Sequence, residues 1–151
     1  MREVATPEEL IRCFREIDRA DVELPLTTLP FPLCFADVLA WSAGPRAFLL
    51  YRDSGRARGI VFHRGSGAVP EAAAMCEWCH TVRSHGGVRL LSVAVDRRRR
   101  VGLYLCADLS CLERARELPG PDDLREGLDV KERSRRIVAR IARFARRSDL
   151  S

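Results

Sequence analysis

Four cysteines in the second half of the chain have the spacing of metal ligands. Cys76 and Cys79 form a C-x2-C pair, and after 26 intervening residues Cys106 and Cys111 form a C-x4-C pair. Structural Zn²⁺ sites take four thiolate or imidazole ligands at the corners of a tetrahedron. We therefore expect one structural zinc ion at these four side chains. Four thiolates close the coordination sphere, which disfavours a catalytic zinc.

The elements around the second pair would bring it to the first pair. Residues 88–95 and 101–105 predict two strands, joined by a turn at Asp96–Arg100. Cys106 then ends a strand, and the sequence LERAREL predicts a helix whose first turns carry Cys111. A knuckle, a hairpin and a helix that supplies the last ligands make a treble clef. The x4 gap departs from the commoner C-x2-C spacing but suits a strand-to-helix junction.

Other interpretations of the cysteines stay open. A redox C-x2-C motif of the thioredoxin type belongs to a βαβ pattern, which this sequence lacks. Cysteines are also often buried without any metal, and the chain has six of them. Cys13 and Cys34 are expected in the core, because both lie among apolar residues far from the two pairs. Trp78 is expected to cover the metal site.

His80 directly follows the first pair. It could replace a cysteine as ligand, donate a hydrogen bond to a ligating sulfur, or contact a partner. An ordinary loop histidine is an equal alternative. We assign it a supporting place beside the ligands.

The N-terminus predicts a short amphipathic helix. The sequence TPEE at residues 6–9 is typical of a helix start, with a threonine cap, a proline in the first turn and a glutamate that closes a capping box. Leu10, Phe14 and Ile17 recur at helical spacing, so the helix is predicted to run to about Ala20.

The remaining elements are short until the C-terminus. The sequence predicts an extended proline-rich segment, a helical turn, a β-hairpin and a last helix, at residues 24–32, 37–42, 47–63 and 130–147. The fold class is α+β: a treble-clef zinc finger with a small antiparallel sheet, an N-terminal helix and a basic C-terminal helix. We expect one domain over residues 1–151, with the N-terminal helix and a wrapping segment in 1–45 and the treble clef in 46–151.

Charge is distributed unevenly along the chain. The net charge is +5, but residues 1–75 carry −1 and residues 76–151 carry +6. No apolar run reaches the ~18 residues of a membrane span, and the first residues lack the apolar core of a signal peptide. We therefore expect a cytoplasmic protein that binds an anionic partner and does not bind a membrane.

Two basic surfaces are candidates for partner binding. One is the predicted turn with Arg97, Arg98, Arg99 and Arg100. The other is a ridge at i+3 and i+4 steps on the last helix, formed by Arg133, Arg136, Arg140, Arg143 and Arg147. An apolar stripe on the same helix is expected to pack on the domain, namely Ile137, Ile141 and Phe144. A merely solvated basic face is the alternative.

The cysteine region resembles a known family. The string MCxWCHTV at 75–82, VGxYxCADLxC at 101–111 and the arginine-rich closing helix are similar to the treble-clef zinc-finger domain of elongation factor G-binding, FusB-type fusidic-acid resistance proteins. The resemblance implies a structural zinc at the four cysteines and a surface that docks on elongation factor G at the ribosome. The resistance proteins carry a helical bundle before this domain, where this chain has one short helix.

The functional hypothesis is a non-enzymatic, zinc-stabilised binding protein of the translation machinery. Its expected partner is elongation factor G or the ribosome, through a protein or an rRNA surface, and no small-molecule substrate is expected. Signatures of zinc deaminases and of H-E-x-x-H enzymes are absent. The first alternative is a nucleic-acid-binding zinc-finger regulator that uses the turn and the ridge on phosphates. A thiol-redox enzyme is the second.

Overall fold

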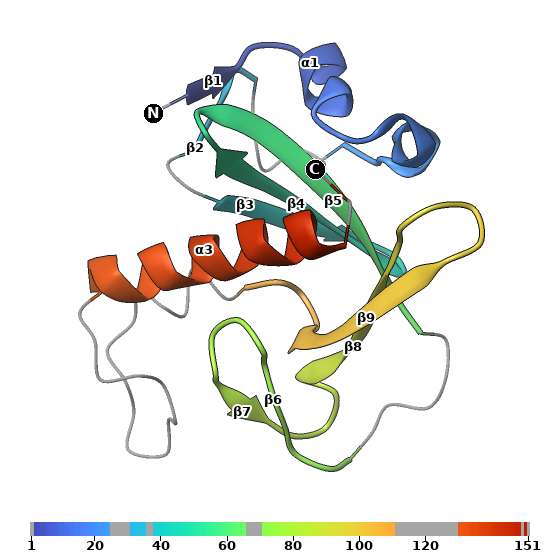
Figure 1. Cartoon of the computed structure of the whole chain (residues 1–151), viewed down its shortest axis with the longest axis vertical. Helices are drawn as coiled ribbons and strands as arrows, with labels where there is room; N and C mark the ends of the chain where they lie inside the picture. The colour runs from blue at the N-terminus through green and yellow to red at the C-terminus, as the bar shows by residue number, and fades with distance from the viewer. Residues whose placement is uncertain are drawn as a thin grey trace.

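A five-stranded antiparallel sheet organises the chain (Figure 1). The structure is a computed structural model, and it describes residues 2–24, 31–35, 38–65, 71–110, 130–148 and 150. The strand order is β3-β4-β5-β8-β9, and these strands span Val38–Ala43, Arg46–Asp53, Arg56–Arg64, Val88–Ala94 and Arg100–Cys106. Two small sheets accompany it: β1 (Arg2–Val4) with β2 (Leu33–Phe35), and β6 (Ala74–Met75) with β7 (Val82–Arg83).

The central hairpin forms as the sequence predicts. β4 and β5 pair from Arg46↔His63 to Asp53↔Arg56. Ser54 and Gly55 make the turn with φ angles of 53° and 79°, the left-handed conformation that a tight hairpin requires. The second predicted hairpin, β8–β9, is confirmed as well.

Side chains of the central hairpin alternate between two cores. Leu49 and Tyr51 on β4 belong to the core on one face of the sheet, and Phe48 and Leu50 belong to the core on the other face. This is the period-2 alternation of a strand that is covered on both sides. The first core lies under α3, and the second lies under the N-terminal segment (Figure 1).

The N-terminal helix is shorter than predicted. α1 spans Pro7–Arg12, and Thr6 caps it by accepting the N–H of Glu9 at 3.2 Å. The chain then leaves the helix because Phe14 bridges to Gly59 of β5, and a 3-10 helix, η1, follows over Glu16–Asp21. The helical periodicity ends at this bridge, so the predicted core residue Ile17 is 47% exposed.

The predicted helical turn at residues 37–42 is wrong. Residues Val38–Ala43 form β3, which pairs with β4 along its whole length, from Val38↔Tyr51 to Ala43↔Arg46. Pairing with a neighbouring strand overrides the weak local preference for helix. Most of the predicted extended segment, residues 25–30, lies outside the described residues.

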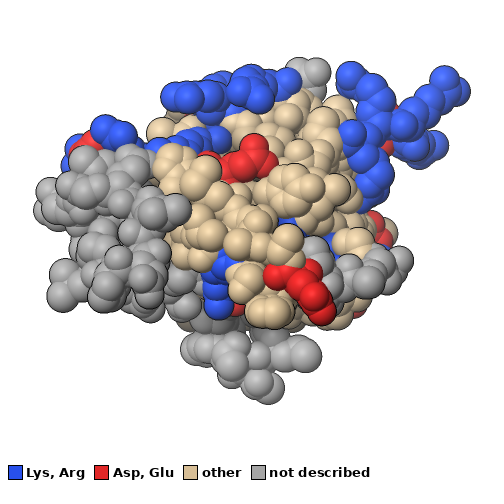
Figure 2. Space-filling model, turned by 90° about the horizontal axis from the view of Figure 1, so that it is seen from below, with Lys and Arg blue, Asp and Glu red and all other residues tan. Residues whose placement is uncertain are grey.

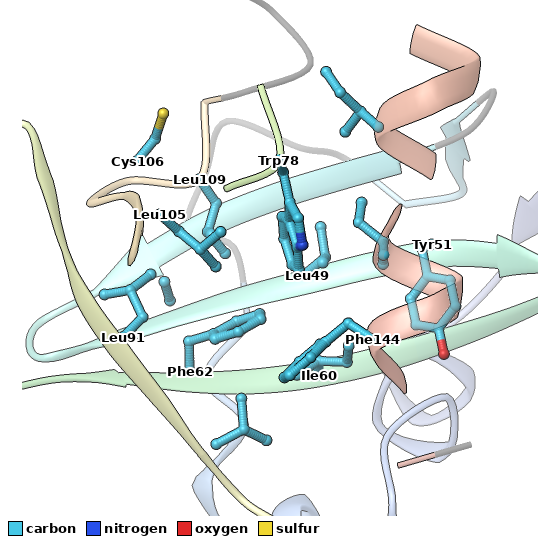
Figure 3. Packing of buried hydrophobic residues seen from close by; sticks show 14 of the residues in the cluster. Leu49, Tyr51, Ile60, Phe62, Trp78, Leu91, Leu105, Cys106, Leu109 and Phe144 are labelled. Carbon is cyan, nitrogen blue, oxygen red and sulfur yellow. The ribbon is translucent and has the colours of Figure 1, made fainter. Parts of the chain in front are cut away.

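The C-terminal helix has its predicted bounds and its predicted apolar face. α3 spans Val130–Arg147 and lies across one face of the sheet (Figure 1). Ile137, Ile141 and Phe144 are buried. Figure 3 shows Phe144 beside Phe62 in the layer between α3 and the sheet, and their stacked rings are 6.4 Å apart. In the described ranges, no helix is long and apolar enough to cross a membrane.

Candidate metal centre

The first cysteine pair lies in a tight knuckle between β6 and β7. The N–H of Cys76 donates to Thr81 O at 2.9 Å, and the N–H of His80 donates back to Cys76 O at 2.9 Å. His80 closes the turn with a φ of 61°, a conformation that is uncommon outside glycine. The knuckle therefore holds Cys76 and Cys79 on one short loop.

Glu77 attaches this knuckle to the edge of β9. Its N–H donates to Tyr104 O at 2.8 Å, and its carboxylate accepts the N–H of Tyr104 at 2.6 Å. One residue thus pairs both outward backbone groups of Tyr104 on an edge strand, as a neighbouring strand would. Cys106 comes two residues later in β9, so this attachment brings it to the knuckle.

Three thiols meet at this junction. The sulfurs of Cys76, Cys79 and Cys106 all lie within 4.8 Å of one another, and the three residues are buried. Cys79 Sγ and Cys106 Sγ are 3.5 Å apart. Zn–S bonds of ~2.3 Å in a tetrahedron place ligand sulfurs roughly 3.8 Å apart, whereas a disulfide needs ~2.05 Å. The donor set therefore fits a zinc ion. In Figure 3 the Cys106 sulfur points away from Leu91 of the core.

The fourth predicted ligand, Cys111, lies outside the described residues, as does the helix predicted after Cys106. The set of four ligands therefore stays a prediction for this position. Cys13 is half-buried, and its thiol donates to Glu9 O at 3.3 Å, outside the three-thiol group. The side chain of Cys34 is outside the described part of the chain.

Trp78 connects the knuckle to the core. Its ring lies edge-on to Phe62 and to Phe144, with centroids 5.7 and 6.1 Å apart, and it is 4% exposed. Arg140 of α3 donates from Nη1 to Trp78 O at 2.5 Å. The helix, the knuckle and the sheet are thus joined at one residue (Figure 3).

Sequence analysis missed Glu77 and Thr81, and it placed Arg140 on the partner-binding ridge rather than in this site. Glu77 and Arg140 act through contacts between segments 27 and 62 residues apart, and no local pattern indicates such contacts. Thr81 is buried, and its Oγ1 has no hydrogen-bond partner within the described ranges. Its place in the CHTV string was the only signal. His80 is half-buried, and its proposed supporting place beside the ligands stays a prediction.

The hairpin turn is exposed and basic, as predicted. Asp96 Oδ1 accepts the N–H groups of Arg98 and Arg99 at 2.7 and 2.9 Å. These hydrogen bonds, with the Arg99 side chain, hold the pKa of Asp96 below its usual value. Arg99 is paired with Asp96 at 3.0 Å, and Arg100 donates to Ser92 Oγ at 2.9 Å. Arg97 and Arg98 have no acidic side chain within ion-pair distance in the described residues.

The predicted ridge on α3 is not uniform. Arg136 is 3.7 Å from Glu132, and Arg140 turns inward to the knuckle. Arg143 and Arg147 are exposed. The side chain of Arg133 lies outside the described part. Figure 2 shows the Lys and Arg side chains of α3 and of the hairpin turn as two groups along one edge of the visible face.

A family model matches most of the chain. The family model described as the FBP C-terminal treble-clef zinc-finger matches residues 8–147. Comparisons with curated proteins and with solved structures give no match. The match covers nearly the whole chain, and it agrees with the knuckle, the hairpin and the three converging thiols. The chain belongs to the FBP C-terminal treble-clef zinc-finger family.

Proposed function

We propose that this protein is a non-enzymatic, zinc-stabilised binding protein of the translation machinery. Its partner in the cytoplasm is elongation factor G, alone or on the ribosome. The observation that carries the proposal is the convergence of Cys76, Cys79 and Cys106 in a chain of this family. The resemblance to FusB-type proteins supports elongation factor G as the partner.

The metal has a structural role in this proposal. Cys111 supplies the fourth thiolate, and four thiolates leave no open position for a substrate or a water. The ligands come from the knuckle, from β9 and from the segment after it. A zinc ion bound there joins parts of the chain that are far apart in sequence. In small zinc domains metal binding contributes on the order of 10 kcal/mol to folding, so these cysteines maintain the shape of the binding surface.

The binding surface is basic and faces an acidic partner. Arg97 and Arg98 at the hairpin turn, and Arg143 and Arg147 on α3, are exposed and have no acidic side chain within ion-pair distance in the described residues. Complementary charge across an interface raises the association rate and selects the partner. Arg99, Arg100, Arg136 and Arg140 have contacts within the protein and contribute less to this surface. Arg133 remains a candidate from the sequence.

Titration of purified elongation factor G with the zinc-loaded chain, in the absence of nucleic acid, tests the proposal. We expect saturable binding, and we expect Arg97→Glu with Arg98→Glu to weaken it tenfold or more. The matched control is Arg12→Glu with Arg56→Glu. Both of these arginines are exposed, at the end of α1 and at the start of β5. The control changes the net charge equally and is expected to bind like the wild type.

Binding to nucleic acid is the second candidate function, favoured by the four exposed arginines of the turn. Neutralised phosphates release counterions, so affinity for RNA would fall log-linearly with salt concentration, with a slope that reports the number of phosphate contacts. This candidate replaces the first under two conditions. Elongation factor G does not bind the chain without nucleic acid, and Arg97→Glu with Arg98→Glu abolishes an RNA complex whose affinity depends on salt.

A further inference from the structure

We propose that a pocket between the knuckle, β9 and α3 receives a carboxylate side chain of a protein partner, with Arg143 and Arg147 as the groups that bind it. The inference rests on the proposed function, because it assigns one contact of the partner to one place on the surface. The chemistry that it requires is a glutamate or an aspartate next to apolar residues.

The pocket lies where the knuckle, β9 and α3 meet. It has a volume of about 140 Å³ and is lined by Glu77, Trp78, Leu103, Arg140, Arg143, Phe144 and Arg147. The helix residues recur at steps of three and four, so they line the same side of α3. Leu103, the half-buried apolar residue of the lining, suits the methylene groups of an acidic side chain, and the guanidinium groups suit its carboxylate.

Two of the three arginines are available to a ligand. Arg140 is held in the wall by its bond to Trp78 O. Arg143 and Arg147 are exposed and have no acidic side chain within ion-pair distance in the described ranges. Like charges four residues apart on a helix repel each other by a few tenths of a kcal/mol. A carboxylate between them removes this repulsion and accepts charge-assisted hydrogen bonds.

The lining favours a carboxylate over a phosphate or a nucleobase. Glu77 is fixed in the wall by its hydrogen bond from the N–H of Tyr104. Its charge opposes a dianionic phosphate more than a single carboxylate. Bases that bind without sequence readout stack on exposed aromatic rings, but Trp78 and Phe144 are 4% and 7% exposed. Their rings belong to the core and offer no stacking face.

A peptide titration followed by NMR of the zinc-loaded full chain tests the assignment. The probes are the acetylated, amidated peptide Leu-Glu-Glu-Leu, its Leu-Gln-Gln-Leu counterpart, inorganic phosphate and a short oligonucleotide. We expect the Arg143 and Arg147 Nε–H resonances and the Trp78 indole resonance to shift saturably with the glutamate peptide, with a dissociation constant on the order of 1 mM. The glutamine peptide should leave them in place.

Two double variants distinguish binding at the pocket from a general effect of positive charge on the surface. Arg143→Gln with Arg147→Gln is expected to weaken peptide binding at least tenfold, while Arg12→Gln with Arg56→Gln retains it. Stoichiometric zinc and an unchanged thermal unfolding curve verify that the first variant is folded. The assignment is overturned if phosphate or the oligonucleotide shifts these resonances at lower concentration, if the pocket variant binds the peptide like the wild type, or if the peptide does not bind.

The same variants distinguish this inference from the proposed function. If elongation factor G binds the wild type and the pocket variant equally well, the pocket assignment fails and the proposed function stands. If the glutamate peptide binds at the pocket but elongation factor G does not bind the chain, the partner is wrong and the pocket assignment stands.

Discussion

At the residue scale, substitution of Cys106 is predicted to have the largest effect on zinc content and stability. Cys106 is the one described thiol of the centre that comes from outside the knuckle, and it is fully buried. We expect Cys106→Ser to lose stoichiometric zinc. Structural zinc contributes on the order of 10 kcal/mol, which is comparable with the 5–15 kcal/mol stability of a typical domain. The variant should therefore be largely unfolded, the knuckle and α3 included. Metal analysis and thermal unfolding by circular dichroism measure both effects.

Cys13→Ser is the matched control for this variant. Cys13 lies outside the three-thiol group and is half-buried. A serine can keep the hydrogen bond that its thiol donates to Glu9 O. We expect full zinc content and a loss of stability of only about 1 kcal/mol, because Cys13 borders the second core without being buried in it. Stoichiometric zinc and an unchanged melting curve in Cys106→Ser would contradict the structural role of the metal.

Gly59 is predicted to tolerate no side chain. A Cβ at this position would lie 2.5 Å from Cδ1 of Phe14, which is itself buried. Overpacking of a core costs about 1–3 kcal/mol, so Gly59→Ala should lower the urea midpoint by a corresponding amount. Gly65→Ala has no heavy atom within 4 Å of its Cβ and is expected to keep the wild-type midpoint. Equal midpoints for the two variants would show that Phe14 moves aside without cost.

Individual residues were predictable where their signal was local. Cys76 and Cys79 follow from their spacing, and the buried face of α3 follows from its periodicity. The role of Gly59 was not predictable, because its small size matters only against the ring of Phe14, which comes from the segment after α1. The contact of Glu77, and the inward contact of Arg140 in place of its predicted partner-binding role, were not predictable for the same reason: each acts on a backbone carbonyl or amide of a distant segment.

At the scale of elements, the junction of β5 with β8 carries a pH dependence. His63 pairs with Ser92 in this junction. Burial, and the positive charges of Arg100 and Arg46, lower the pKa of His63 from 6.5, while Asp21 and Asp18 act in the opposite direction. Below pH 6.5 the unfolded chain therefore binds more protons than the folded chain. The free energy of unfolding rises with pH from the lowered pKa up to about 6.5 and then levels.

We expect His63→Gln to remove this part of the pH dependence. Urea unfolding at several pH values between 5 and 7.5 should give a smaller slope for the variant than for the wild type, because glutamine does not titrate. His85→Gln is the control, since His85 is exposed, and it is expected to retain the wild-type slope. If His63→Gln also keeps that slope, the acid sensitivity arises elsewhere.

Elements were predictable in proportion to their length and to the strength of their own pattern. The bounds of α3 and the two hairpins agree with the sequence. β3 and the end of α1 were not predictable. β3 is a strand because it pairs with β4, and α1 ends where it does because Phe14 bridges to Gly59. Both are tertiary interactions, which outweigh local preferences of a few tenths of a kcal/mol.

At the scale of the whole molecule, the two cores cannot be lost separately. They share β4 and β5, on which Leu49 faces one core and its neighbour Leu50 faces the other. Arg15, next to the bridge of Phe14, also donates to the carbonyls of Ala94 and Val95 at the end of β8. The N-terminal segment and the zinc-finger half are therefore connected both through the sheet and around it. We predict a single cooperative unfolding transition for the zinc-loaded chain.

The two tryptophans of the chain test this prediction, because each lies in a different core. Trp41 stacks on Phe48 with centroids 5.5 Å apart, and Trp78 packs against Phe62 and Phe144. In Trp41→Phe the fluorescence reports only the core under α3, and in Trp78→Phe it reports only the core under the N-terminal segment.

For each zinc-loaded variant, the urea midpoint by fluorescence should equal its midpoint by far-UV circular dichroism, since two-state unfolding makes different probes coincide. A Trp78 signal that is lost at lower urea than the secondary structure would mean that the zinc-finger half unfolds first, and the chain would then consist of two units rather than one domain.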